Sequence, residues 1–186
     1  MQSKPLVIAV FCGSKNGNSP LFEKDATELG QLIARNNMEI IYGGGSKGLM
    51  GAVANGALEQ GGVVTGVIPE VLLKWESQHT GLTRLLITEG MHSRKKIMYE
   101  RCDAAVVLPG GFGTLDELFE MLTWNQLQIH DKKIYLLNTA DFYSHLMKHM
   151  NNMNTLGFLY ESLPSKIHLC ESPEKIIDTL NEINHV

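Results

Sequence analysis

Short apolar runs rich in β-branched residues alternate along this chain with longer stretches of helical periodicity. The short runs are almost continuously apolar, which is typical of parallel strands that are covered on both faces. Such alternation predicts a parallel sheet with helices on both sides. The predicted fold class is therefore α/β: a Rossmann-like, doubly wound, mostly parallel sheet of about seven strands. The expected strands span residues 6–11, 39–42, 63–68, 84–88, 104–108, 133–137 and 166–170, and the expected helices span 20–35, 49–60, 93–101, 115–129, 142–150 and 173–183.

The length of the chain fits one folding unit. At 186 residues, we expect a single domain over residues 1–186 that buries roughly 70% of the surface of the unfolded chain. No apolar run approaches the roughly 20 residues of a membrane span, and no signal-peptide pattern opens the chain. We therefore expect no membrane partner.

Charge and cysteine content exclude several classes of protein. The net charge of −4 argues against a nucleic-acid-coating protein. The three cysteines are far apart with no CxxC pair, and the seven histidines show no metal-ligand spacing. We therefore expect no disulfide framework, no metal site and a cytoplasmic location.

The most informative single segment is residues 104–117. Its strand-like part ends at Pro109, three glycines follow within four residues, and an amphipathic run begins at Thr114. Glycines let a ligand approach the backbone closely, and the free N–H groups of a first helical turn attract anions. The segment predicts a phosphate site beyond the end of a strand, where ligands bind in such sheets.

Glu117 has two possible roles in that segment. Thr114 and Glu117 fit a capping box, with threonine as the N-cap and glutamate three residues into the helix. From the residues alone, this structural role is favoured over a catalytic one. The alternatives are distinguishable, because glutamine can also serve in a capping box but cannot act as a carboxylate base.

A second glycine cluster, residues 43–48, follows the second predicted strand. It matches neither a Walker loop nor a dinucleotide fingerprint. A tight strand-to-helix turn explains such a cluster about as well as a phosphate site does, although two clusters after parallel strands favour phosphate. Arg94, Lys95 and Lys96 open a predicted helix, where positive charge opposes the helix dipole. Solvated side chains are the default interpretation, and an anionic ligand held by Arg94 is the alternative.

The residues around these segments resemble the LONELY GUY (LOG) family. Pro109–Glu117 matches the family signature PGGxGTxxE in full, residues 91–95 read Met-His-Ser-Arg-Lys, and residues 123–127 also look like that family. The resemblance implies a cytokinin riboside 5′-monophosphate phosphoribohydrolase, which cuts the N-glycosidic bond of an N6-modified AMP. Many bacterial members also hydrolyse AMP itself. Related chains have been labelled lysine decarboxylases, but no lysine here sits in a recognisable pyridoxal phosphate context.

The resemblance also implies the site residues and the assembly. Arg94 and Glu117 fall where the family has its catalytic pair, no cofactor is required, and the shorter members are homodimers. The hydrophobic residues of the predicted helix after the signature, on more than one face, also favour a homodimer. The substrate-binding residues carried over by motif position are Glu76, Arg94, Lys95, Gly111, Phe112, Gly113, Thr114, Leu115, Asp116, Glu117 and Thr123.

The chemistry of the reaction agrees with this resemblance. Breaking an N-glycosidic bond builds positive charge on the ribose, which a fixed carboxylate stabilises while it orients or deprotonates water. Two alternatives remain open at this point. One is a non-catalytic carrier that binds a phosphorylated ligand on the same fold; the presence of both Arg94 and Glu117 favours the enzyme. The other is a DNA-binding relative, against which the acidic balance counts.

Overall fold

The computed structural model describes residues 4–73, 78–160 and 167–183. Its centre is a seven-stranded sheet in the order β4-β3-β2-β1-β5-β6-β7, and every strand pair is parallel. This confirms the predicted fold class. The strands are β1 (Val7–Phe11), β2 (Glu39–Tyr42), β3 (Val64–Pro69), β4 (Arg84–Thr88), β5 (Ala104–Val107), β6 (Ile134–Leu137) and β7 (Ile167–Cys170). The helices are α1 (Pro20–Arg35), α2 (Gly48–Glu59), α3 (Met91–Arg101), α4 (Phe112–Gln126), α5 (Ser144–Thr155) and α6 (Pro173–Ile183), with 3-10 turns η1 (Glu70–Leu72) and η2 (Thr139–Asp141).

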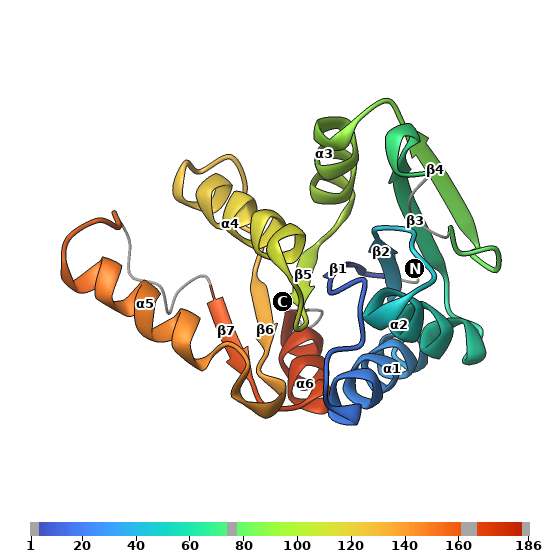
Figure 1. Cartoon of the computed structure of the whole chain (residues 1–186), viewed down its shortest axis with the longest axis horizontal. Coiled ribbons are helices and arrows are strands. Elements are labelled where there is room, and N and C mark those ends of the chain that lie inside the picture. The colour runs from blue at the N-terminus through green and yellow to red at the C-terminus, as the bar shows by residue number, and fades with distance from the viewer. Residues whose placement is uncertain (1–3, 74–77, 161–166, 184–186) are drawn as a thin grey trace.

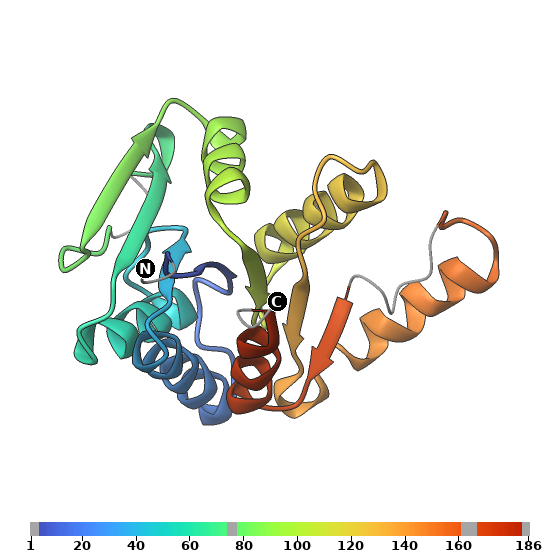
Figure 2. The same cartoon turned by 180° about the vertical axis from the view of Figure 1, so that it is seen from behind.

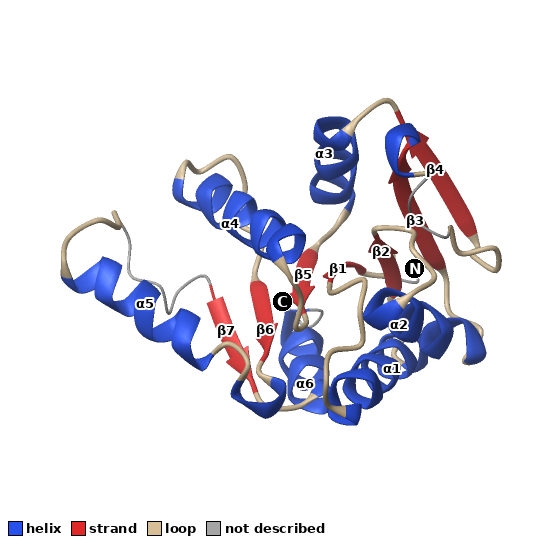
Figure 3. Cartoon of the chain, viewed as in Figure 1, coloured by secondary structure: helices blue, strands red, loops and turns tan. Residues whose placement is uncertain are grey.

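The helices form two layers, one on each face of the sheet. Helices α1, α2 and α6 cover one face, and α3, α4 and α5 cover the other (Figure 1 and, from behind, Figure 2). Figure 3 shows the same view with the strands in red and the helices in blue. Each layer has its own hydrophobic cluster, and both clusters share the sheet.

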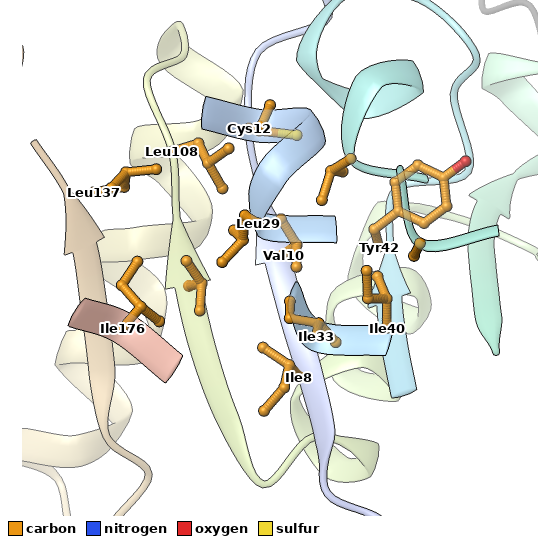
Figure 4. Packing of buried hydrophobic residues seen from close by; sticks show 14 of the residues in the cluster. Ile8, Val10, Cys12, Leu29, Ile33, Ile40, Tyr42, Leu108, Leu137 and Ile176 are labelled. Atoms are coloured by element: carbon orange, nitrogen blue, oxygen red, sulfur yellow. The ribbon is translucent and has the colours of Figure 1, made fainter. Parts of the chain in front are cut away.

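The central strand β1 shows how the sequence produces this arrangement. Successive side chains of a strand point to opposite faces, so Ile8 and Val10 enter one cluster while Ala9 and Phe11 enter the other. Figure 4 shows Ile8 and Val10 near Leu29 of the α1–α2–α6 layer. Because both faces are buried, β1 must be apolar throughout, as the sequence predicts.

Strand β1 also marks the place where the winding reverses. The chain moves from β1 through β2 and β3 to one edge of the sheet, then returns to the other side of β1 with β5. In open α/β sheets, ligands bind beyond the carboxyl ends of the strands at such a point. The fold therefore directs attention to the loops that follow β1, β2 and β5.

Most predicted boundaries agree with the structure to within a few residues, but the start of α4 does not. We predicted a helix from residue 115 with Thr114 as its N-cap, whereas α4 begins at Phe112 with Gly111 as N-cap and no side-chain capping bond. The predicted capping box is therefore wrong: Thr114 is the third residue of α4 and Glu117 the sixth. The helix starts early because Gly111 takes an extended conformation that leads directly into the first turn.

Two further points concern α5 and the membrane. The predicted helix over residues 142–150 corresponds to α5, which begins two residues later and continues five residues further, to Thr155; Ala140 and Asp141 before it take left-handed conformations (φ 51° and 59°). Among the residues that the structure describes, none of the helices is both long enough and apolar enough to cross a bilayer.

Candidate active site

The loops after β1 and β5 meet at the carboxyl end of the sheet. The N–H group of Gly13 donates a hydrogen bond to the carbonyl of Pro109 at 3.0 Å. A Cβ atom at position 13 would lie 3.3 Å from the Cα atom of Gly110, so the approach leaves little room for a side chain. The expected convergence of the strand-end loops is therefore confirmed for this pair.

The loop after β2 reaches the same place and is joined there to the loop after β1. The N–H groups of Leu49 and Met50, in the first turn of α2, donate to the carbonyl of Gly13 at 3.0 and 3.3 Å. Gly48 has φ +61°, and a side chain there would collide with the backbone of the loop after β1. The close approach explains the glycines of this cluster, and these two α2 amides are not available to a phosphate.

A buried ion pair spans the two helices above this edge. Nη2 of Arg94, on α3, lies 3.7 Å from Oε1 of Glu117, on α4, and the two side chains are 9% and 11% exposed. The guanidinium also rests against Gly43, where a Cβ atom would collide with it. In the sequence, only the family resemblance indicated that Arg94 and Glu117 act as a pair. In the structure they are close because α3 and α4 lie on the same face of the sheet.

The guanidinium of Arg94 is poorly saturated with hydrogen bonds. Its Nε atom is buried and has no partner among the described residues, and Nη1 has a 3.9 Å contact to Sδ of Met91. Buried donors of charged groups are normally satisfied. An acceptor supplied from outside the chain would satisfy this one.

The turn that opens α4 is exposed to solvent at Gly111, Phe112 and Gly113. Gly111 and Gly113 have no atom within 4 Å of the position of a Cβ atom, so packing within the chain does not explain their lack of a side chain. Phe112 between them is 94% exposed. In contrast, Thr114 is buried against Gly110, whose missing side chain it requires. The first three N–H groups of α4 have no carbonyl of the preceding turn to bind.

A cavity of about 350 Å³ opens beside this turn, at the point where the strand order reverses. Gly110 and Gly111 form one wall, and the loop after β1 supplies the exposed polar residues Ser14, Lys15 and Asn16. The sequence reasoning did not include Lys15, which lines this cavity, among the candidate site residues. Its position two residues after the Gly13 turn, at the end of the central strand, is the signal that could have found it.

Four other predicted site residues differ in their surroundings: two bind each other, one packs in the core and one is exposed on α4. Lys95 is buried, with Nζ 3.0 Å from Oδ2 of Asp116 and 2.6 Å from Oε2 of Glu120, so the predicted ligands Lys95 and Asp116 bind each other. Leu115 packs against the core of the α3–α4–α5 layer. Thr123 is exposed, six residues further along α4 than Glu117, and its hydroxyl donates to the carbonyl of Phe119.

Glu76 lies outside the described residues, but the segment that follows it is anchored at the site. His79 donates its backbone N–H to Gly44 at 3.0 Å, and Gln78 forms a bridge with Gly45. The N–H of Gly81 donates to Nδ1 of His79, which leaves Nε2 to donate to Asn55 at 2.9 Å. Burial lowers the pKa of this imidazole.

Cys12 is a buried thiol close to the ion pair. Burial and the nearby Glu117 carboxylate raise the pKa of its thiol well above the ordinary value, with Arg94 opposing them. A neutral thiol is a poor nucleophile. Within the described ranges, no group of three His, Cys, Asp or Glu side chains is arranged to hold a metal ion.

Comparisons with known proteins bear on this arrangement. A family model described as "Possible lysine decarboxylase" matches residues 50–180. The description does not fit Lys95, the buried lysine at the site. Hydrogen bonds to Glu120 and Asp116 raise its pKa on balance, although burial alone would lower it. Schiff-base chemistry requires a neutral amine instead.

Named relatives agree on a different activity. The chain is 40% identical over 174 residues to a cytokinin riboside 5′-monophosphate phosphoribohydrolase of Rhodococcoides fascians, a match that covers 93% of this chain and 88% of the relative. It is 37% identical over 182 residues to cytokinin riboside 5′-monophosphate phosphoribohydrolase LOG1 of Arabidopsis thaliana, covering 98% and 85%.

Solved structures confirm the fold. The molybdenum cofactor carrier protein of Chlamydomonas reinhardtii superposes with a TM-score of 0.76 at 21% identity, covering 98% of this chain and all of that one. The molybdenum cofactor binding protein of Rippkaea orientalis gives 0.74 at 24%, covering 98% and 99%. At such identities the likeness concerns the fold alone. The sequence matches are much stronger, and they show that the chain belongs to the LONELY GUY family of cytokinin riboside 5′-monophosphate phosphoribohydrolases.

Proposed function

We propose that this protein hydrolyses the N-glycosidic bond of adenosine 5′-monophosphates, N6-modified or plain, and releases the free base and ribose 5-phosphate. Family membership supports this reaction. The structural observation that carries it is the buried Arg94–Glu117 pair beside the open glycine turn of α4. The turn suits a phosphate, and the carboxylate suits the positive charge of a ribosyl transition state.

In the proposed mechanism, the phosphate binds the N–H groups at the start of α4, from Gly111 to Thr114. This anchor fixes the ribose next to Glu117. As the bond between C1′ and the base nitrogen breaks, the electron pair leaves with the base and positive charge develops on the ribose. Glu117 stabilises that charge and accepts a proton from the attacking water, whose oxygen bonds to C1′. A proton from solvent neutralises the departing base.

Arg94 has two tasks in this proposal. Its Nη2 edge faces Glu117 and orients that carboxylate. Its unpartnered Nε atom offers a donor to the bound nucleotide. Lys15 borders the neighbouring cavity and adds a positive charge close to the phosphate.

One assay tests the activity. Pure protein is incubated with AMP, with isopentenyladenosine monophosphate and with adenosine, and free base is measured by chromatography. We expect base from both monophosphates and little from adenosine, because the nucleoside lacks the phosphate anchor. Equal turnover of adenosine would contradict the anchor. Tight binding of AMP without release of base would instead favour the non-catalytic carrier.

We further propose that the protein works as one domain, in the cytoplasm, as a homodimer. Some of the apolar residues that suggested a dimer pack within the chain instead: Met121 is fully buried, and Trp124 packs against Tyr99. The end of α4 still exposes Leu127 and Ile129, at 63% and 60%. Exposed apolar residues gathered at one place are typical of an interface.

A further inference from the structure

The chain contains two Asn-Gly sequences, Asn16-Gly17 and Asn55-Gly56. An asparagine that precedes glycine is especially prone to lose its side-chain amide, because glycine has no side chain to hinder attack by its own backbone nitrogen. In that attack the nitrogen must reach the side-chain carbonyl carbon of the asparagine, so the asparagine needs freedom to rotate about its backbone and side-chain bonds. The two sequences differ in this freedom.

The fold protects the second sequence. Asn55 and Gly56 lie inside α2, where the helix holds each residue in one backbone conformation. The side chain of Asn55 is held as well, since its Oδ1 atom lies 2.9 Å from Nε2 of His79. Gly56 packs so closely on α1 that a Cβ atom would lie 2.2 Å from the carbonyl oxygen of Thr27. The nitrogen of Gly56 is therefore kept from the attack.

The first sequence has no such protection. Asn16 and Gly17 lie in the loop between β1 and α1, and both are exposed. The side chain of Asn16 makes one printed contact, a hydrogen bond of 2.8 Å from Nδ2 to Oε2 of Glu23 in the first turn of α1. Water competes for both partners of an exposed hydrogen bond, so this contact restrains the amide only weakly.

Gly17 is required by the structure. Its φ of +76° belongs to the left-handed region that favours glycine, and a Cβ atom there would lie 2.7 Å from the ring of Phe22. Any other residue at position 17 would strain the backbone and collide with this ring. The fold thus demands the very residue that makes Asn16 reactive.

The position of Asn16 makes a change of charge there important for the site. Asn16 and its neighbour Lys15 both line the cavity beside the turn that opens α4. A carboxylate at position 16 would offset the positive charge of Lys15 and repel an anion bound at that turn. It would also repel the carboxylate of Glu23, which now accepts a hydrogen bond from the amide.

We propose that Asn16 is a site of spontaneous deamidation, and that the carboxylate formed there weakens the binding of a nucleotide phosphate. The backbone nitrogen of Gly17 bonds to Cγ of Asn16, the bond from Cγ to Nδ2 breaks, and ammonia leaves with the proton of the attacking nitrogen. The product is a cyclic imide. Water then adds to either imide carbonyl and opens the ring to aspartate or isoaspartate. The effect on the nucleotide rests on the proposed function, whereas the modification itself does not.

Peptide mapping tests the modification. Freshly purified protein is compared with protein aged in mildly alkaline buffer, and mass spectrometry identifies the peptides in which an amide has become an acid. Fragment ions separate Asn16 from Asn18, and an isoaspartate-specific methyltransferase detects the rearranged product. We expect aspartate and isoaspartate to accumulate at Asn16 while Asn55, the internal control, stays intact.

Kinetics test the consequence for the site. Asn16→Asp reproduces one product, and KM for AMP should rise roughly threefold to tenfold, with kcat within about twofold, because the exposed charge acts on phosphate binding. High salt should reduce this rise. Asn16→Gln keeps a neutral amide but reacts far more slowly. Its KM should therefore stay constant during ageing, while KM of the original protein increases.

A matched pair of variants separates the new charge from the lost hydrogen bond. In Glu23→Gln, the amide of Asn16 still has an oxygen acceptor. In Asn16→Asp/Glu23→Gln, the glutamine amide donates to the new carboxylate, so a hydrogen bond is available in both proteins. We expect KM to be higher in the double variant than in Glu23→Gln. Equal KM values would show that the loop contact matters and not the charge, and would reject the effect on phosphate.

The remaining outcomes are equally decisive. An intact Asn16 after ageing, or modification of Asn55 to the same extent, would overturn the proposed site. A modified Asn16 with an unchanged KM would reject its effect on binding. If the original protein releases no base, the proposed hydrolysis fails. AMP binding by calorimetry then replaces KM: weaker affinity after ageing supports the proposal, and equal affinity, or no AMP binding by fresh protein, rejects the effect on the nucleotide.

Discussion

At the scale of single residues, Glu117 is the position where sequence and structure differ most usefully. The sequence favoured a capping role, but α4 begins at Phe112 and places Glu117 beyond the first turn, facing Arg94. A capping box depends on contacts between neighbours, so its pattern is readable in the sequence. The pairing with Arg94 joins two helices separated by β5, and no local pattern reveals it.

Glu117→Gln tests the catalytic role directly. Glutamine keeps the size and one oxygen acceptor but removes the charge, so turnover of AMP should fall by roughly a hundredfold or more. The loss of a charged partner for Arg94 should lower the free energy of unfolding by about 1–3 kcal/mol. Steady-state assays and urea unfolding measure the two effects. Normal turnover in this variant would remove Glu117 from the mechanism.

Two adjacent glycines provide a second test with an internal control. Gly111→Ala places a methyl group in open space with a negative φ, so the fold should be unaffected. The same methyl faces the proposed phosphate, and KM for AMP should rise roughly tenfold, the equivalent of about 1.4 kcal/mol. Gly110→Ala should instead affect stability, because its methyl group would collide with Thr114. We expect the free energy of unfolding to fall by about 1–3 kcal/mol. Equal KM values for Gly111→Ala and the original protein would place the phosphate elsewhere.

At the scale of elements, the inner strands β1, β2, β3, β5 and β6 were predictable because they are buried on both faces and are therefore mostly apolar. The second glycine cluster was not. Its glycines suggested a phosphate site, but the α2 amides donate to Gly13, more than thirty residues earlier in the chain. Likewise, the pairing of Lys95 with Glu120 depends on how two helices lie together. Sequence patterns of short range report on neighbours along the chain and miss such contacts.

The anchoring of the segment after residue 77 gives a pH-dependent prediction. Burial lowers the pKa of His79, whose Nδ1 atom accepts a hydrogen bond only when it is unprotonated. The unfolded chain, with an ordinary histidine pKa of about 6.5, therefore binds the proton more readily than the folded chain. Stability should fall as the pH drops from 7.5 through 6.5 toward the lower folded pKa. The midpoint of urea unfolding measures this change. His79→Gln should reduce its slope over that range, and an unchanged slope would show that other groups cause it.

At the scale of the whole molecule, the exposed end of α4 leads to a prediction about assembly. Leu127 and Ile129 are more than half exposed beyond the helix, and a homodimer would cover them. Light scattering at micromolar concentration should give twice the mass of the chain. Leu127→Glu should shift the mass toward the monomer without loss of secondary structure. A monomeric mass for the original protein would contradict the dimer.

The central position of β1 in the sheet affects how the chain folds during its synthesis on the ribosome. β1 pairs with β2 on one side but with β5, some hundred residues later, on the other. During synthesis the first half of the chain therefore emerges with one edge of its most apolar strand uncovered, a surface that invites pairing with other chains. Arg94 and Glu117 cannot meet until α4 has emerged, so no nucleotide can stabilise the nascent chain through this site. We therefore expect the nascent chain to associate with other chains more readily than the finished protein does, until β5 covers that edge of β1.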